Sequence, residues 1–373
     1  MTTTARLKTA WWKLPFQDNS KWLNLMLLAV PVAFLLHYTN ASPVTIFIFA
    51  SLGIIPLAGL LGNATEALAV YSGPAIGGVL NATMGNAAEL IIAFFALRAG
   101  HIEVVKASLS GSIIGNVLLV LGLSILVGGI GREKQTFSRT VSSANSTMLF
   151  IAAIALIMPA VYDLAVTGSL KANPPMLQKL SLLTSIVLMA LYLISFIFML
   201  KTHRSLFRAQ AEEAPKHKPK MSRTTALVTL AVATVFIAFL SEMLVGEIEA
   251  VTKTLGLTEL FVGVIVVAII GNAAEHSAAI MVAHRNQMDL ALGIAVGSST
   301  QIALFVAPLL VMLSWVIGHP MSLVFNPFEL AGVVLSVLIV EMISYDGETN
   351  WFEGAQLLAV YLILAMSFYF VPA

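Results

Sequence analysis

The sequence predicts an all-α integral membrane protein with about eleven transmembrane helices, arranged as an extra first helix followed by two inverted five-helix repeats. Three observations lead to this prediction. Hydrophobic residues make up 58% of the chain and charged residues only 10%, whereas roughly a quarter of the residues of a soluble domain are charged. Apolar stretches long enough to cross a bilayer recur along the chain. The pentapeptide GNAAE at residues 85–89 returns unchanged at 271–275.

The hydropathy pattern gives the limits of each predicted span, because a transmembrane helix needs about 20 mostly apolar residues. The first span, at 22–38, follows a polar segment, and we expect it to be retained in the membrane rather than cleaved as a signal. Five spans follow before a polar segment and five after it. Their predicted limits are 43–71, 74–98, 104–129, 140–163, 177–200, 224–252, 258–284, 289–317, 328–344 and 352–371.

The polar segment between Leu200 and Thr224 is rich in Lys, Arg and Pro and is typical of a linker. The predicted organisation is an N-terminal segment with the extra helix (1–42), a first repeat (43–200), a cytoplasmic linker (201–223) and a second repeat (224–373). Five is odd, so the two repeats run in opposite directions through the membrane. The positive-inside rule places the N-terminus in the cytoplasm. We expect a multi-pass protein of a prokaryotic-type cell membrane.

Charge and cysteine usage exclude several classes of protein. The formal net charge is +1, which argues against a nucleic-acid partner. There are no cysteines, so any metal is bound by oxygen or imidazole ligands. We expect the lipid bilayer as the surroundings and no resident cofactor. The sequence leaves open both a monomer and a homo-oligomer.

The repeated pentapeptide carries the candidate site. Glu89 and Glu275 lie in predicted spans, where an ionisable residue usually marks an ion or proton pathway. Asn86 and Asn272 precede them by three residues and share their helix face. The glycines beside the acids are expected to let each helix unwind. Polar stripes on the following helices add Ser112, Ser298 and Gln301. The asparagines and these three residues also fit simple helix packing.

The two glutamates have the chemistry of a cation site. Neither has a Lys or Arg partner in its own predicted helix, and two carboxylates match the charge of a divalent cation. Ca²⁺ accepts about 6 to 8 oxygen ligands in a flexible shell. Without the metal, two anions in a low-dielectric cavity repel each other, so we expect them to take up protons as a coupled pair. Competition between metal and protons predicts an antiporter, with Glu89 and Glu275 as the metal ligands.

Three further residues are candidates for a proton relay or for cation access. Glu66 and Glu242 occupy matching positions on the span before each pentapeptide. A structural role fits them equally well. His276 follows Glu275 but lies about 100° around the helix, so it is expected to tune the site or to pack rather than to ligate.

The sequence resembles the calcium/proton exchangers of the cation/calcium exchanger superfamily. The resemblance covers nearly the whole chain after the first span and rests on three motifs: GGVLNATMGNAAEL at 77–90, GNAAEH at 271–276 and GSSTQIAL at 297–304. It implies Ca²⁺ export driven by proton influx, with Glu89 and Glu275 as the central residues. It also implies contributions from Asn86, Asn272, Ser298 and Gln301. Mn²⁺ remains an alternative cargo.

Two other classes of function were weighed. An intramembrane hydrolase would need a nucleophile and a base, which Ser298 and His276 would have to supply. The chain has no HExxH metal motif, and a hydrolase does not explain the duplicated acid, so we expect no enzymatic activity. A channel would also use acidic residues, but two acids in inverted repeats fit alternating access better.

Overall fold

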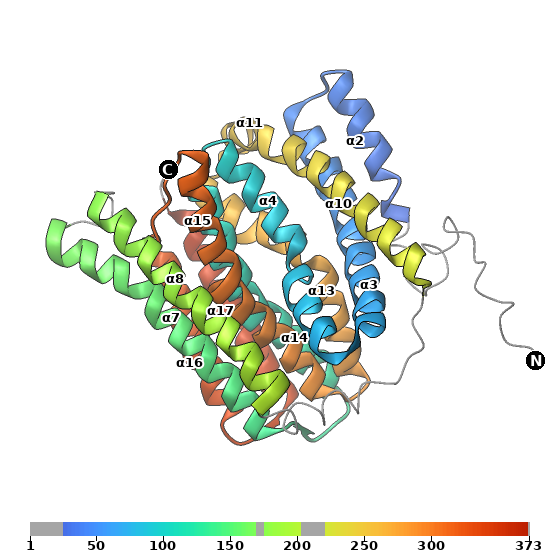
Figure 1. Cartoon of the computed structure of the whole chain (residues 1–373), viewed down its shortest axis with the longest axis vertical. Helices are drawn as coiled ribbons and strands as arrows, with labels where there is room; N and C mark the ends of the chain where they lie inside the picture. The colour runs from blue at the N-terminus through green and yellow to red at the C-terminus, as the bar shows by residue number, and fades with distance from the viewer. Residues whose placement is uncertain (1–24, 169–174, 203–220, 372–373) are drawn as a thin grey trace, which may run out of the picture.

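A computed structural model describes residues 25–168, 175–202 and 221–371, and its long elements are all helices (Figure 1). Those before residue 203 are α2 (Ala29–Tyr38), α3 (Pro43–Met84), α4 (Ala87–Arg98), α5 (Ile102–Ile114), η2 (Gly115–Val120), α6 (Leu121–Gly129), α7 (Arg139–Thr167), α8 (Pro175–Ile197) and η3 (Phe198–Thr202). Those after residue 220 are α10 (Arg223–Gly246), α11 (Ile248–Leu255), α12 (Glu259–Phe261), η4 (Val262–Val267), α13 (Ala268–His284), α14 (Met288–Gln301), η5 (Ile302–Val306), α15 (Ala307–Ile317), α16 (Pro327–Ser344) and α17 (Trp351–Phe370).

The helices follow the predicted spans closely from residue 43 onward. Among the described residues, nine helices are long and apolar enough to cross a membrane, or ten if the bent pair Ile76–Met84 and Ala87–Arg98 forms one span. α2 is a shorter apolar helix at the end of the predicted first span. The N-terminal segment up to residue 24 and residues 203–220 of the predicted linker lie outside the described residues. The all-helical membrane fold is confirmed, and the described part supplies up to ten full-length spans rather than eleven.

Local sequence signals explain where several helices begin and end. The Ser42 hydroxyl accepts the N–H of Thr45 at the start of α3, and Ser222 does the same for α10. Such caps satisfy backbone donors that have no partner within the helix. At the other end, α7 and α15 stop at Gly168 and Gly318, whose φ values are 70° and 88°. Glycine adopts this left-handed conformation without steric cost.

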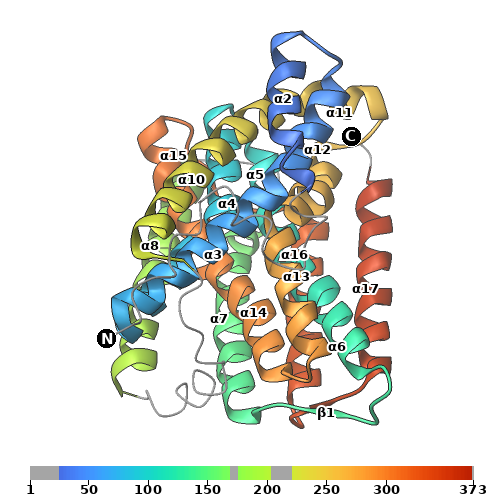
Figure 2. The same cartoon turned by 90° about the vertical axis from the view of Figure 1, so that its right-hand side faces the viewer.

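A two-stranded sheet marks one end of the bundle. β1 (Gln135–Thr136), after α6, pairs with β2 (Glu348–Thr349), between α16 and α17. Arg132 Nη2, in the same loop as β1, donates to the carbonyl of His284 at the end of α13 (3.2 Å). We call this the sheet end; it lies at the bottom of Figure 2. α13 ends and α14 begins there. By contrast, α4 ends and α5 begins at the far end, because α5, η2 and α6 form one continuous span that reaches the sheet end.

The outer faces of the bundle are apolar. On α8 and α10, for example, Ile194, Val187 and Leu227 are more than half exposed. Large exposed apolar surfaces are unusual in soluble proteins and mark a membrane or protein contact. Inside the bundle, small residues allow close helix approach. A Cβ atom at Gly354 on α17 would lie 2.5 Å from the backbone nitrogen of Leu126 and 2.7 Å from the carbonyl oxygen of Gly122.

We predict that Gly354→Ala destabilises the protein by about 1 to 3 kcal/mol, the usual range for overpacking, because backbone atoms of α6 cannot move aside. Gly246→Ala is the matched control, since a Cβ atom there would meet nothing within 4 Å. Thermal unfolding in detergent, followed by size-exclusion chromatography, measures both. Equal stability of the two variants would contradict the close packing of α17 on α6.

Candidate functional site

The two acids of the repeated pentapeptide lie close together inside the bundle. Glu89 lies in the first turn of α4 and is 8% exposed. Glu275 lies on α13, which packs against α4, and is partly buried. The two carboxylates are close enough to repel each other electrostatically. The structure therefore brings together the acids that the sequence singles out as a pair.

Each acid faces the glycine of the other pentapeptide. A Cβ atom at Gly271 would lie 3.0 Å from Cγ of Glu89, and one at Gly85 would lie 3.5 Å from Oε1 of Glu275. The contact at Gly271 is tighter than ordinary packing, so a larger residue there would displace Glu89 or push α4 away from α13. Glycine at this position thus sets the distance between the two acids.

The identical pentapeptides have different backbones. In the first copy the helix breaks at Gly85 and Asn86, and the segments on either side meet at 45°. In the second copy α13 continues without a break, and the irregular stretch is the π-helical segment η4, which precedes it. The predicted unwinding beside the acid is therefore right for Glu89 and wrong for Glu275. The break also places Glu89 at a helix N-terminus, where a negative charge is stabilised.

The predicted polar residues form hydrogen bonds across the two halves of the chain. Asn86 belongs to the first half, whereas Ser298 and Gln301 belong to the second, and Asn272 reaches back to the first. The bonds run from Asn86 Nδ2 to Gln301 Oε1 (2.5 Å), from Ser298 Oγ to Asn86 Oδ1 (2.9 Å) and from Asn272 Nδ2 to Ser112 Oγ (2.9 Å). Ser298 also lies beside the Glu275 carboxylate. The amide groups are therefore held by one another rather than left open.

Asn116 completes this network and was missed by the sequence analysis. It lies in η2 and is 1% exposed. Its Nδ2 donates to Asn272 Oδ1 (3.2 Å) and to Ser298 Oγ (3.1 Å), so it joins the two sets of bonds. Counting from the two pentapeptides, the equivalent position in the second half is Ile302, and reasoning from repeats therefore passes over it. The sequence signal that could have identified Asn116 is its isolated amide side chain within a long apolar stretch.

Three of the four carboxylate oxygens lack hydrogen-bond partners. Both oxygens of Glu89 and Oε2 of Glu275 are buried and accept no hydrogen bond within the described part of the chain. A small cavity beside Glu89 is lined by Ser108, Ser112 and Ala268, among others. An ionised carboxylate in such surroundings is strongly disfavoured unless a cation or a proton neutralises it.

A metal at this site would have Glu89 and Glu275 as its charged protein ligands. No group of three or more His, Cys, Asp or Glu residues that could hold a metal ion occurs among the described residues. A cation between Glu89 and Glu275 would therefore take its remaining ligands from amide, hydroxyl or backbone oxygens. Such an all-oxygen set suits hard cations such as Ca²⁺ and Mg²⁺ better than it suits zinc or copper.

The approaches to the site differ between the two ends of the bundle. Gly111 on α5 is packed so tightly against the backbone of Val264 in η4 that a Cβ atom there would overlap it. Its equivalent on α14, Gly297, is partly exposed, and a Cβ atom there would meet nothing within 4 Å. The α5 backbone at Gly111 is thus covered by η4, whereas the space beside Gly297 on α14 is free.

No hydrogen bond among the described residues joins the candidate relay residues to this network. Glu66 on α3 is exposed. Glu242 on α10 is also exposed and lies 4.0 Å from the guanidinium of Arg98, at the far end. His276 is partly buried next to Glu275, and no hydrogen bond of the described residues joins it to the network. A relay or access role for these three residues stays a prediction.

A protein-family model, curated relatives and solved structures all match this chain. The model of the family described as sodium/calcium exchanger protein matches residues 42–201 and 225–370. The chain belongs to this family. The resemblance read from the sequence motifs is therefore confirmed.

Curated relatives match along nearly the whole chain. A Ca²⁺/H⁺ antiporter of Aphanothece halophytica is 45% identical over 360 residues, which cover 93% of this chain and 96% of the relative. The Ca²⁺/H⁺ antiporter ChaA of Bacillus subtilis (strain 168) is 45% identical over 340 residues, which cover 90% and 94%.

Solved structures share the fold. The structure of native YfkE has a TM-score of 0.81 and 40% identity, with 94% of this chain and 100% of that chain covered. The H⁺/Ca²⁺ exchanger CAX has a TM-score of 0.68 at 14% identity, with 93% and 91% covered. The second of these shows similarity of fold alone.

We predict that Asn116→Leu destabilises the protein, because Asn272 Oδ1 and Ser298 Oγ lose a donor in a buried site. Leaving a buried polar group without its partner costs about 1 to 3 kcal/mol. Ser124→Ala is the matched control, since its buried hydroxyl has no partner among the described residues. Thermal unfolding of both variants tests the network, and an Asn116→Leu protein as stable as the control would contradict it.

Proposed function

We propose that this chain is a secondary active antiporter that exchanges Ca²⁺ for H⁺ across a membrane. The observation that carries the proposal is the pair of carboxylates of Glu89 and Glu275, three of whose four oxygens are buried without a hydrogen-bond partner among the described residues, while the amides around them are hydrogen-bonded. The relatives named Ca²⁺/H⁺ antiporters cover nearly the whole chain and support the identity of the two cargoes. The family and the transporter class of its relatives argue against an enzyme.

The donor set fits a calcium ion that binds and leaves. Two carboxylates balance its charge, and the ion pairs of the described residues all involve other acids. Hydroxyl and amide oxygens of Ser298, Asn86 and Gln301 lie next to the pair and can turn toward an ion. Ca²⁺ tolerates variable coordination with about 6 to 8 oxygens, whereas Mg²⁺ requires a near-octahedral shell and retains its waters.

Protons provide the second way to neutralise the pair. When calcium leaves, Glu89 and Glu275 would face each other as two buried anions, and this arrangement favours uptake of protons. A protonated pair in turn has no net charge with which to hold a divalent ion. Metal and protons therefore occupy the same oxygens in turn, and this competition couples the movement of one to that of the other.

Several observations support alternating access through inverted repeats. The family model matches two ranges of similar length. α4 ends at the far end of the bundle, whereas its equivalent α13 ends at the sheet end. Gly111 is packed against the backbone of Val264, whereas its equivalent Gly297 has free space beside it. We propose that the opposite state covers Gly297 and uncovers Gly111, so that the acid pair faces each side of the membrane in turn.

Three basic residues at the sheet end favour one orientation of the chain in the membrane. Arg132, Lys134 and Arg139 lie at the sheet end, and the positive-inside rule places such loops in the cytoplasm. The structure would then present the site to the cytoplasm. We retain the predicted division into an N-terminal segment, two five-helix repeats and a cytoplasmic linker as part of the proposal.

We predict that Glu89→Gln and Glu275→Gln each abolish most of the proton-driven calcium uptake. The amide cannot carry a proton in exchange, and loss of one carboxylate ligand is expected to weaken calcium binding at least about tenfold, or about 1.4 kcal/mol. The measurement uses acid-loaded proteoliposomes diluted into alkaline buffer that contains radioactive calcium.

Glu249→Gln is the matched control, because Glu249 is an exposed acid that pairs with Lys253 on the surface of α11. Each Gln variant of the pair should also unfold at the same temperature as the wild type or higher, since it removes one buried charge. Wild-type uptake by a folded Glu89→Gln or Glu275→Gln protein would overturn the proposed site.

A further inference from the structure

Four residues of α14, each about one turn after the last, lead from the sheet end toward the acid pair. Asp289, Gly293, Gly297 and Gln301 are spaced four residues apart, so they follow one another along one face of the helix. The line rises about 18 Å and ends at Gln301, the partner of Asn86 in the site. A Cβ atom at Gly293 or Gly297 would meet nothing within 4 Å.

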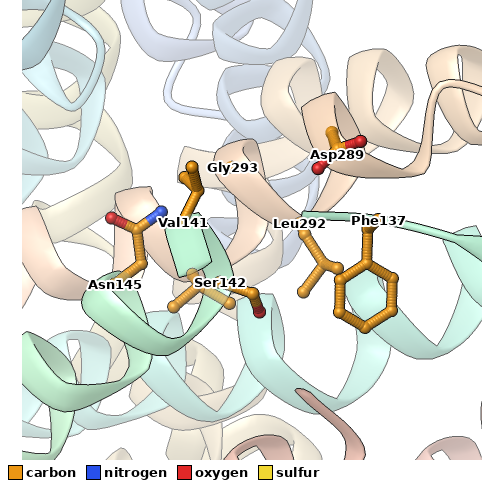
Figure 3. A pocket seen from close by; sticks show the side chains of 8 residues that line it. Phe137, Val141, Ser142, Asn145, Asp289, Leu292 and Gly293 are labelled. Carbon is orange, nitrogen blue, oxygen red and sulfur yellow. The ribbon is translucent and has the colours of Figure 1, made fainter. Parts of the chain in front are cut away.

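A cavity lies at the start of this line, between the first turns of α7 and α14 (Figure 3). Its polar lining consists of Asp289, Ser142 and Asn145, and its apolar lining includes Phe137 and Leu292. The Ser142 hydroxyl is buried, at 7% exposure for the residue, and has no hydrogen-bond partner among the described residues.

A second buried serine whose hydroxyl lacks a hydrogen-bond partner lies one turn further along α7. Ser146 is 1% exposed, and its hydroxyl also lacks a partner within the described part of the chain. Buried hydroxyls are nearly always hydrogen-bonded to protein or to ordered water, and a small polar cavity accommodates water. Ser142 thus marks a position for ordered water in the cavity beside Asp289, and Ser146 continues the row of unbonded hydroxyls inward along α7.

Asp289 is fixed at the mouth of this face. Its Oδ1 accepts the backbone N–H of Ser138, just before α7, at 2.6 Å. The basic side chains on the neighbouring loop contact groups other than Asp289. Arg132 donates to the carbonyls of Gly128 and His284, Lys134 pairs with Glu348 at 2.7 Å, and Arg139 lies over the ring of Tyr345 at 4.7 Å. The remaining charged or titratable groups nearby, His284 and Arg285, end α13.

The equivalent face at the far end, between α5 and α16, also holds a small cavity, but its polar groups are paired. The counterpart of Asp289 is Glu103, which pairs with Lys106 at 3.3 Å. On α14 the position of Lys106 is taken by Leu292, so Asp289 has no such partner. Deeper on α5, the Ser110 hydroxyl donates to Glu329 Oε1 at 2.6 Å. Ser110 and Glu329 in the far-end cavity are thus bonded to each other, whereas the Ser142 and Ser146 hydroxyls have no hydrogen-bond partner among the described residues.

We propose that protons pass between the sheet end and the acid pair along this α7–α14 face, through ordered water, with Asp289 as the carboxylate that collects them at the mouth. The inference rests on the proposed exchange. The face suits protons better than calcium, because beyond the single carboxylate of Asp289 a lining of Ser142, Asn145 and apolar side chains offers too few oxygens to replace the ion's ligands. Calcium would reach the site by another path.

Two modes of transport in the same proteoliposomes separate these cargoes. Calcium uptake driven by a pH step requires protons to move, whereas exchange of radioactive for unlabelled calcium does not. The variants are Asp289→Asn and Gly293→Cys, the latter modified after folding with a membrane-impermeant thiol reagent. The natural chain has no cysteine, so the added thiol is the only target. Gly246→Cys, with equally free space at the far end, is the matched control.

We expect Asp289→Asn and modified Gly293→Cys to slow pH-driven uptake several-fold while calcium isotope exchange keeps the wild-type rate. An equal fall in both modes would overturn the route, because the face would then serve calcium or the conformational change. Unchanged rates in both modes would overturn it as well. Absence of pH-driven uptake in the wild type would instead overturn the proposed function, and the route with it.

Discussion

Two carboxylates lie side by side inside the bundle with no basic partner among the described residues, and the rest of the structure follows from this constraint. Glu89 and Glu275 repel each other electrostatically, and three of their four oxygens are buried without a hydrogen-bond partner among the described residues. Leaving such a pair ionised is expensive in a low-dielectric interior. A divalent cation or protons remove that cost, and exchange of one for the other is the chemistry we assign to the protein.

The fold places the pair and keeps its surroundings rigid. α4 and α13 come close because Gly271 leaves room for Glu89. The amides and hydroxyls around the acids are occupied by one another through Asn86, Asn272 and Asn116. A bonded polar network resists rearrangement, so the helices that carry the acids are held in place while most of the carboxylate oxygens stay unbonded. In the proposed exchange, the difference between the packed Gly111 and the free space beside Gly297 sets which end of the bundle gives access.

Much of this was readable from the sequence, since hydropathy and an exact internal repeat are strong signals. The helices from residue 43 onward follow the predicted spans, and the structure brings the two pentapeptides together. Three features were not readable. One of two identical pentapeptides breaks its helix at Gly85 while the other continues, because tertiary packing and not local sequence decides the backbone there. Asn116 has no counterpart in the second half. The lining of the α7–α14 face depends on which serines find a partner, which only the packed structure shows.

Proton release on calcium binding tests the central claim most directly. Isothermal titration calorimetry of the purified protein, in buffers of different ionisation enthalpy at the same pH, counts the protons displaced by each bound ion. We predict net proton release from the wild type and less release from Glu89→Gln and from Glu275→Gln, because each variant removes one group that trades its proton for the metal. Calcium binding without proton release at every pH where the protein is folded would contradict the account.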